Sequence, residues 1–194
     1  LLFWRSFSHW IGGMGILVFV LAILPNTDAR SIYIMQAESP GPQSGKLVSK
    51  IRITARILYL IYIILTLILI ILLSFKIPFF DSACNGLATA GTGGFAIKNT
   101  SIGYYNSVYV DVVLTVFMVL FAINFNLFYF LLIGNIKSVL KSEELRTFLS
   151  IIIVAITLIT VNLLTANVFQ TFGEALRHSS FQVGSIISTT GFST

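Results

Sequence analysis

The sequence predicts an all-α integral membrane protein that is built from repeated helix–pore loop–helix units. Hydrophobic residues make up 56% of the 194 residues and charged residues only 10%, far from the composition of a soluble domain. Four apolar runs are long enough to cross a hydrocarbon core of about 30 Å, and they cover residues 1–25, 57–75, 108–133 and 148–169. A more polar segment that contains Thr-x-Gly follows the second run, and another follows the fourth.

These two polar segments, residues 80–95 and 174–194, are predicted to form re-entrant pore loops. Each is too polar to span a bilayer, and each ends in small residues whose backbone can lie open. In such a loop a half-helix descends partway, and an extended strand returns with its carbonyl groups facing a water-filled path. A ring of carbonyl oxygens can replace the hydration shell of a cation. The sequence therefore predicts a cation-conducting membrane protein.

The two expected half-helices cover residues 81–88 and 173–188. Their C-terminal ends carry a partial negative charge, which favours a cation nearby. Asp81 stands at the start of the first half-helix, where we expect it to act as the N-cap. As an alternative, a Thr-x-Gly can simply end a helix, because glycine readily adopts the left-handed conformation. Two such motifs on the same side of the membrane favour the pore-loop interpretation.

The distribution of basic residues predicts the orientation in the membrane. Eight lie in the connections after the first and third apolar runs, namely Arg30, Lys46, Lys50, Arg52, Arg56, Lys137, Lys141 and Arg146. Four lie on the opposite side, namely Arg5, Lys76, Lys98 and Arg177. The positive-inside rule makes the first group cytoplasmic, so both pore loops enter from the outside. Arg5 and Arg177 are expected to reach the outer headgroups with their side chains.

The order of elements predicts parts of three repeats. Residues 1–25 form the inner helix of repeat 1, and residues 26–50 form a cytoplasmic connection. Residues 51–135 form repeat 2, with an outer helix, the pore loop 80–95 and an inner helix over 107–133. Residues 136–194 begin repeat 3, with an outer helix over 148–169 and the pore loop 174–194. A closed ring needs about four loops, so we expect the chain to be an internal part of a longer protein.

Four groups of residues carry a family resemblance. They are Trp4-Arg5 with Gly12-Gly13-Met14-Gly15, the segment Glu38-Ser39-Pro40-Gly41-Pro42, the segment from Ala88 to Phe95 with Ser101-Ile102-Gly103-Tyr104-Tyr105 after it, and the segment from Ser188 to Thr194. In this order they resemble the TrkH family, the potassium-translocating membrane subunits of bacterial Trk systems. The resemblance extends along essentially the whole chain.

The resemblance implies four pore-helix repeats around one pseudo-fourfold pathway, usually as a homodimer in the cytoplasmic membrane. It implies potassium uptake, with potassium as substrate, no bound cofactor, and control by a cytosolic TrkA-like nucleotide-binding subunit. Gly91 and Gly191 correspond by position to filter glycines. The backbone carbonyls expected to form the filter belong to Thr89, Ala90, Gly91, Thr92, Thr189, Thr190, Gly191 and Phe192. Ala90 replaces a larger aliphatic residue, which should alter packing more than conduction.

Two other functions fit the same residues. One is a sodium-permeable transporter of the HKT type, because the choice between potassium and sodium depends largely on a first filter that lies outside this chain. The other is a membrane assembly subunit that conducts nothing, with its Thr-x-Gly segments serving as helix caps. An enzyme is not expected, since the sequence contains no nucleophile–base pair, metal-ligand cluster or phosphate-binding loop. Nucleic-acid binding is not expected either, because the basic residues flank apolar runs.

Two asparagines are further candidates for the pathway. Asn124 and Asn126 lie within the third apolar run, where polar side chains often mark a route for ions. An interhelical hydrogen bond is nevertheless the favoured role of each. The glycine cluster at residues 12–15 is expected to allow close helix packing rather than ion contact.

Overall fold

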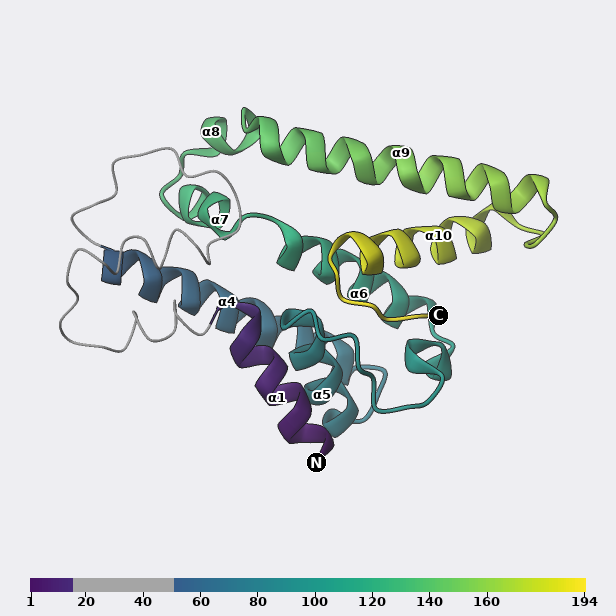
Figure 1. The fold of residues 1–194 in the computed structure, drawn as a ribbon, viewed down its shortest axis with the longest axis horizontal. Helices are drawn as coiled ribbons and strands as arrows, with labels where there is room; N and C mark the ends of the chain where they lie inside the picture. The colour runs from purple at the N-terminus through teal and green to yellow at the C-terminus, as the bar shows by residue number, and fades with distance from the viewer. Residues whose placement is uncertain (16–50) are drawn as a thin grey trace.

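The computed structural model describes residues 1–15 and 51–194, and within them every regular element is helical. Figure 1 shows the arrangement. The elements in chain order are α1 (Leu2–Gly13), α4 (Ile51–Ser74), α5 (Phe79–Ala90), the 3-10 helix η1 (Ser101–Tyr105), α6 (Val108–Ala122), α7 (Phe125–Leu132), α8 (Ile136–Leu140), α9 (Glu143–Thr165) and α10 (Phe172–Ile187). The predicted all-α class is confirmed. The expected cytoplasmic connection, and the first apolar run beyond residue 15, lie outside the described residues.

Within the described residues, two helices are each long and apolar enough to cross a membrane. They are α4, over Ala55–Ser74, and α9, with mean hydropathies of 3.0 and 2.5. At 1.5 Å per residue these spans of 20 and 23 residues are roughly 30 and 34 Å long, which is enough to cross a hydrocarbon core of about 30 Å. α9 begins earlier than the expected residue 148, because the Ser142 hydroxyl accepts a hydrogen bond from the Leu145 amide.

The inner helix expected over residues 107–133 is divided in two. α6 and α7 meet at an angle of 91°, and only together are they long and apolar enough to form a membrane span, as a bent pair. α6 alone is roughly 22 Å long, too short to cross the core by itself. The break lies at Ile123 and Asn124, whose ψ angles of 143° and 117° are extended. The Asn124 side chain then caps α7 by accepting a hydrogen bond from the Asn126 amide at 3.0 Å.

The helices form two groups that meet at α6 (Figure 1). The half-helix α5 packs against α1 and α4, and the half-helix α10 packs against α9. Both half-helices also contact α6. The two predicted pore loops are therefore attached to one central helix.

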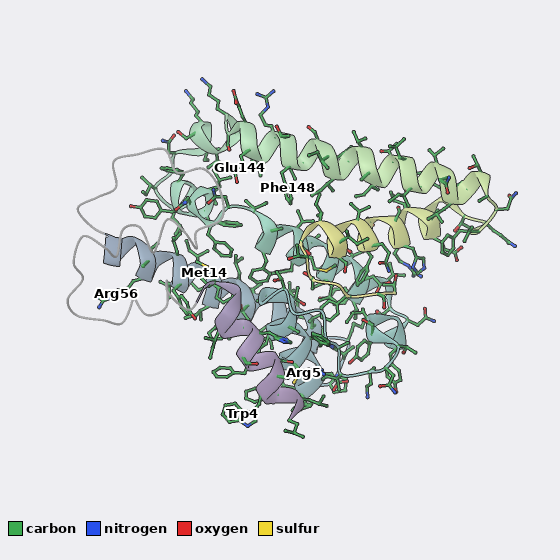
Figure 2. The ribbon with its side chains drawn as sticks, in the orientation of Figure 1. Trp4, Arg5, Met14, Arg56, Glu144 and Phe148 are labelled. Atoms are coloured by element: carbon green, nitrogen blue, oxygen red, sulfur yellow. The ribbon has the colours of Figure 1, made fainter. Side chains whose placement is uncertain are left out.

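An aromatic pair joins α1 to α4. The Trp10 and Tyr62 rings stack with centroids 5.5 Å apart. Tyr62 is buried, and its Oη donates to the Trp10 carbonyl at 2.8 Å, while Trp10 Nε1 donates to Thr66 Oγ1 at 3.1 Å. Each polar atom in this apolar contact thus has a partner, which burial requires. Figure 2 shows Trp4 at the far end of α1, pointing away from the other helices.

Candidate functional site

The first predicted pore loop begins with α5, whose 12 residues are roughly 18 Å long and cannot cross a bilayer. After Ala90 the Thr92 amide donates to the Thr89 carbonyl at 3.1 Å, and the Gly93 amide donates to the Ala88 carbonyl at 2.7 Å. This pair of bonds is a Schellman motif. Its left-handed residue is Thr92, with φ 49°, and a second positive φ of 66° follows at Gly94.

The second predicted pore loop has the same two left-handed positions after α10, but its longer hydrogen bond comes from the fourth residue after the helix rather than from the third. The Thr189 amide donates to the Ile186 carbonyl at 3.0 Å, and the Gly191 amide donates to the Ser185 carbonyl at 3.2 Å. Positive φ angles occur at Thr189, 59°, and at Gly191, 90°. The Ser185 hydroxyl donates to the Phe192 carbonyl at 2.7 Å, which holds the returning chain against its own helix.

The shared pattern gives the structural register between the two loops. Thr92 and Thr189 are each the second residue after their helix, and Gly94 and Gly191 are each the fourth. In this register Gly91 is equivalent to Ser188, and both occupy the C-cap position. Gly94, which the sequence interpretation did not include among the site residues, is therefore the structural counterpart of Gly191.

The predicted filter residues of the first loop lie mainly at the helix end. Thr89 and Ala90 belong to α5 and are buried. The Thr89 hydroxyl donates to the Asn85 carbonyl at 2.7 Å. Gly91 has an ordinary φ of −82° and lies against the backbone of His9, where a Cβ would clash. Gly91 thus serves close packing between α1 and the loop.

The predicted filter residues of the second loop alternate in exposure. Thr189 and Gly191 are exposed, whereas Thr190 and Phe192 are buried. The Thr190 hydroxyl lies 2.7 Å from that of Ser188. The alternation shows that Thr190 and Phe192 face the protein, while Thr189 and Gly191 lie on the open side.

The two loops meet in space. The backbone of Gly94 lies against the Thr190 carbonyl oxygen, so closely that a Cβ on Gly94 would clash with it. Further along, the amides of Ile102 and Gly103 both donate to the Ser193 carbonyl, at 3.1 and 3.3 Å. The structure thus brings together two segments that stand almost a hundred residues apart in the sequence.

α1 packs directly against the first predicted pore loop. A Cβ on Gly13 would lie 2.5 Å from the Cα of Gly91, so the close packing expected for the glycine cluster is confirmed at this position. The Arg5 guanidinium donates to the Ala96 carbonyl at 3.0 Å and lies 5.4 Å from the centre of the Phe95 ring. The expectation that Arg5 reaches the headgroups was wrong, because its charge has carbonyl acceptors within the protein. Figure 2 shows Arg5 beside α5.

Asp81 does not cap α5. The N-cap is Pro78, which makes no side-chain hydrogen bond, and Asp81 instead accepts a hydrogen bond from Tyr105 Oη at 2.8 Å. Asn85 Nδ2 donates to the same Tyr105 oxygen at 3.3 Å, and Lys98 Nζ lies 4.0 Å from the Asp81 carboxylate. Burial, together with the hydrogen bond to Asp81, raises the pKa of Tyr105. Tyr105 therefore remains a hydroxyl group that can donate.

A second polar cluster surrounds the start of α10. Arg177 Nε lies 3.6 Å from Asp111 Oδ2 of α6, so this arginine was also wrongly expected at the headgroups. Arg177 Nη2 lies 3.0 Å from His178 Nε2, and His178 Nδ1 lies 3.0 Å from Thr194 Oγ1. Because a guanidinium can only donate, Nε2 is the acceptor, and the proton of neutral His178 is on Nδ1.

The two asparagine candidates lie at the break between α6 and α7. Asn124 is buried, caps α7, and donates through Nδ2 to the Glu144 carboxylate of α9 at 3.3 Å. Figure 2 shows Glu144 in the first turn of α9, near α7. This contact is the interhelical hydrogen bond that the sequence analysis favoured for Asn124. Asn126 contributes its backbone amide to the cap.

A comparison with family models matches all residues, 1–194, to the TrkH cation transport protein family. The chain belongs to this family. It is 32% identical to the Trk system potassium uptake protein TrkH of Salmonella typhimurium and 33% identical to that of Escherichia coli K12, in each case over all of this chain. The Escherichia coli protein TrkG is 32% identical, again over the full chain.

The solved crystal structure of the potassium transporter TrkH from Vibrio parahaemolyticus has the same fold. It superposes on 95% of this chain with a TM-score of 0.74 and 29% sequence identity, and the match covers 37% of that protein. The predicted membrane architecture of repeated helix–pore loop–helix units is therefore that of TrkH. The chain spans 41% of the length of the TrkH relatives named above.

Sequence reasoning missed the side chains that support the loops. The sequence gives no indication that Tyr105 and Thr194 hydrogen-bond to the half-helices, because their partners lie on other elements. The left-handed positions at Thr92 and Thr189 were also invisible, since threonine does not favour positive φ. Among the described residues there is no cluster of acidic, histidine or cysteine side chains that could hold a metal ion.

Proposed function

We propose that this chain forms part of a pathway for potassium uptake across the cytoplasmic membrane, selected by backbone carbonyls from several pore loops. The observation that carries the proposal is the contact between Gly94 and the Thr190 carbonyl, at which two equivalent loops meet. Loops from successive repeats that converge on one point are what a shared pathway requires. The names of the TrkH and TrkG relatives support potassium as the substrate.

The register between the loops sharpens the proposed filter. The carbonyls of Thr89 and Ala88 already accept hydrogen bonds from the turn that ends α5. We therefore shift the first filter from the predicted residues 89–92 to residues 91–94. The second filter keeps Thr189, Thr190 and Gly191 but not Phe192, because the Phe192 carbonyl accepts a hydrogen bond from the Ser185 hydroxyl. Positive φ angles reverse the direction of the adjacent peptide groups, which lets successive carbonyls turn toward one side.

The positions of the basic side chains support the proposal that the filters lie on the outer side of the membrane. Lys137, Lys141 and Arg146 lie exposed around α8 and the start of α9. Near the loops, by contrast, Arg5, Lys98 and Arg177 each bind a carbonyl or carboxylate of the protein. Lys76 is exposed on the outer side as well, but in the described residues exposed basic side chains are more numerous at the end that the positive-inside rule makes cytoplasmic. The same end is where we place the contact with a TrkA-like nucleotide-binding subunit, and we propose a homodimer as the assembled form.

The proposed filter can be tested by substituting two glycines that have similar backbone angles, one inside the filter and one outside it. Gly191 has φ 90° and Gly134, in the turn between α7 and α8, has φ 81°, and a Cβ on either meets nothing within 4 Å. Alanine at each position therefore costs about 1–2 kcal/mol of backbone strain and causes no clash. We would measure rubidium-86 uptake, with competition by potassium and sodium, in potassium-uptake-deficient cells that express the natural protein containing this sequence.

Gly191→Ala should lower the preference for potassium over sodium, while Gly134→Ala should leave that preference intact. Equal behaviour of the two variants would remove Gly191 from the filter. Wild-type uptake that sodium blocks as well as potassium does would favour the HKT-like alternative. No uptake by protein that is inserted normally, with its cytosolic partner present, would favour the non-conducting assembly subunit.

A further inference from the structure

The chain that follows each proposed filter loop returns to the half-helix of that loop. There a hydroxyl group of the returning chain lies within hydrogen-bond distance of two side chains of the half-helix. On α5 these side chains are Asp81 and Asn85, and the hydroxyl belongs to Tyr105. On α10 they are His178 and Gln182, whose Nε2 lies 3.5 Å from Thr194 Oγ1. In both helices the two holding residues are four positions apart and therefore lie on one face.

The two holding pairs occupy the same places in the loop register. Asp81 and His178 are each the tenth residue counted back from the end of their helix, and Asn85 and Gln182 are each the sixth. The chemistry differs, since one pair presents a carboxylate and an amide and the other an imidazole and an amide. The arrangement is the same. A recurrence in two repeats with different residue types indicates a common role rather than an accident of packing.

The two hydroxyl groups are also joined to each other. Tyr105 ends η1, and η1 binds the chain next to Thr194 through three hydrogen bonds. The amides of Ile102 and Gly103 donate to the Ser193 carbonyl, and the Ser193 amide donates to the Ser101 hydroxyl at 3.2 Å. A continuous series of hydrogen bonds therefore runs from α5, through Tyr105 and η1, to residues 193 and 194, and on to α10.

We infer that this series, which we call the inter-loop bridge, positions the two filter loops relative to each other and thereby sets ion discrimination. The bridge consists of Asp81, Asn85, Tyr105, Ser101, Ser193, Thr194, His178 and Gln182. The inference rests on the proposed function of the loops. Carbonyl rings discriminate by the number and placement of their oxygens, and the loops touch at Gly94 and Thr190. A shift of one loop past the other changes that placement without removing any carbonyl.

The test is a double-mutant cycle on the two ends of the bridge. Tyr105→Phe and Thr194→Val each remove one held hydroxyl, and neither residue is a proposed filter carbonyl. The matched controls are Tyr104→Phe, because Tyr104 is 59% exposed beside Tyr105, and Ser193→Ala, because Ser193 joins the bridge through its backbone. The readout is the ratio of rubidium to sodium uptake by the natural protein in cells, at matched amounts in the membrane.

Each single substitution should lower that ratio about fivefold, the effect of losing one net hydrogen bond from the selective arrangement. The ratio for the double variant should be no lower than that of the more strongly affected single variant. Both substitutions break the same series of hydrogen bonds, so their effects should not add. The controls should behave like wild type. Unchanged ratios in both single variants, or a double variant that multiplies the two losses, would overturn the inference.

A second readout separates this inference from the proposed function. In the purified protein, Tyr105→Phe should speed hydrogen–deuterium exchange at residues 189–193, across the bridge, while Tyr104→Phe should not. This outcome does not depend on transport, so it holds even if the protein conducts nothing. Unaltered exchange at residues 189–193 would count against the bridge. Where Thr194→Val fails to reach the membrane, Gln182→Met removes the amide donor at similar volume and must lower the ratio.

Discussion

The Nε atom of Arg177 lies 3.6 Å from Oδ2 of Asp111, and this ion pair joins the second half-helix α10 to the central helix α6. The side chains are 20% and 7% exposed, so the pair is largely withdrawn from solvent. Removing one partner from such a pair leaves the other charge buried without compensation. The pair therefore connects the stability of α10 to that of α6.

Asp111→Asn should destabilise the protein by about 3 kcal/mol, because the Arg177 guanidinium loses its carboxylate. The measurement is the thermal unfolding midpoint of the purified protein in detergent. The double variant Asp111→Asn with Arg177→Gln should unfold at a higher temperature than the single variant. Glu174→Gln is the control, since Glu174 is exposed in the first turn of α10. An Asp111→Asn protein as stable as wild type would show that the pair contributes nothing.

Gly12 and Gly13 should respond oppositely to alanine. A Cβ on Gly13 would meet Gly91, the Ala90 carbonyl and Tyr62 Oη within 3 Å, whereas a Cβ on Gly12 meets nothing within 4 Å. Alanine is favoured over glycine in a helix by about 1 kcal/mol. Gly12→Ala should therefore be neutral or stabilising in a thermal melt, and Gly13→Ala destabilising. The same change in both melting points would contradict the close contact between α1 and the end of α5.

Asn124→Ala should loosen α7 at its start. The substitution removes the side-chain cap, worth about 1 kcal/mol, and the hydrogen bond to Glu144. Hydrogen–deuterium exchange should become faster at residues 125–132. Asn126→Ala is the matched control, because it keeps the backbone amide that takes part in the cap. If the two variants exchange alike, the cap does not stabilise the break between α6 and α7.

Cys84 should report on the packing of α5. The sequence contains one cysteine, and its side chain is 1% exposed in the described structure. A thiol reagent should therefore label the unfolded protein quickly and the folded protein slowly. Gly91→Ser, which introduces a side chain against the His9 backbone, should raise the labelling rate. Rapid labelling of the folded wild-type protein would be inconsistent with the buried position.

Most of the fold could be predicted from the sequence, because the length and hydropathy of an apolar run identify a membrane span without any tertiary information. The runs at 57–75 and 148–169 correspond to α4 and α9, and the two polar segments cover all but the first one or two residues of α5 and α10. The division at Ile123 and Asn124 was missed because hydropathy continues through it. Its cause is a cap and a hydrogen bond to Glu144, and that residue belongs to another helix.

The candidate site could be predicted only in part from the sequence. The Thr-x-Gly motifs indicate where each half-helix ends, but the first motif begins inside α5 and the second begins after the end of α10. As a result the same motif places Gly191 as the fourth residue after α10, and Gly91 at the cap of α5. Gly94 became the equivalent of Gly191 only when the backbone angles could be compared.

The sequence by itself determined that this chain is a helical membrane protein with two half-length polar helices, and its motifs indicated the family. These properties follow from composition and local order, which act along the chain. The tertiary structure alone decided which residues meet: Gly94 with Thr190, Arg177 with Asp111, and Tyr105 with Asp81. The physical reason is that a hydrogen bond or an ion pair requires approach within a few ångströms, and only the packing of the helices against α6 fixes which distant residues come that close.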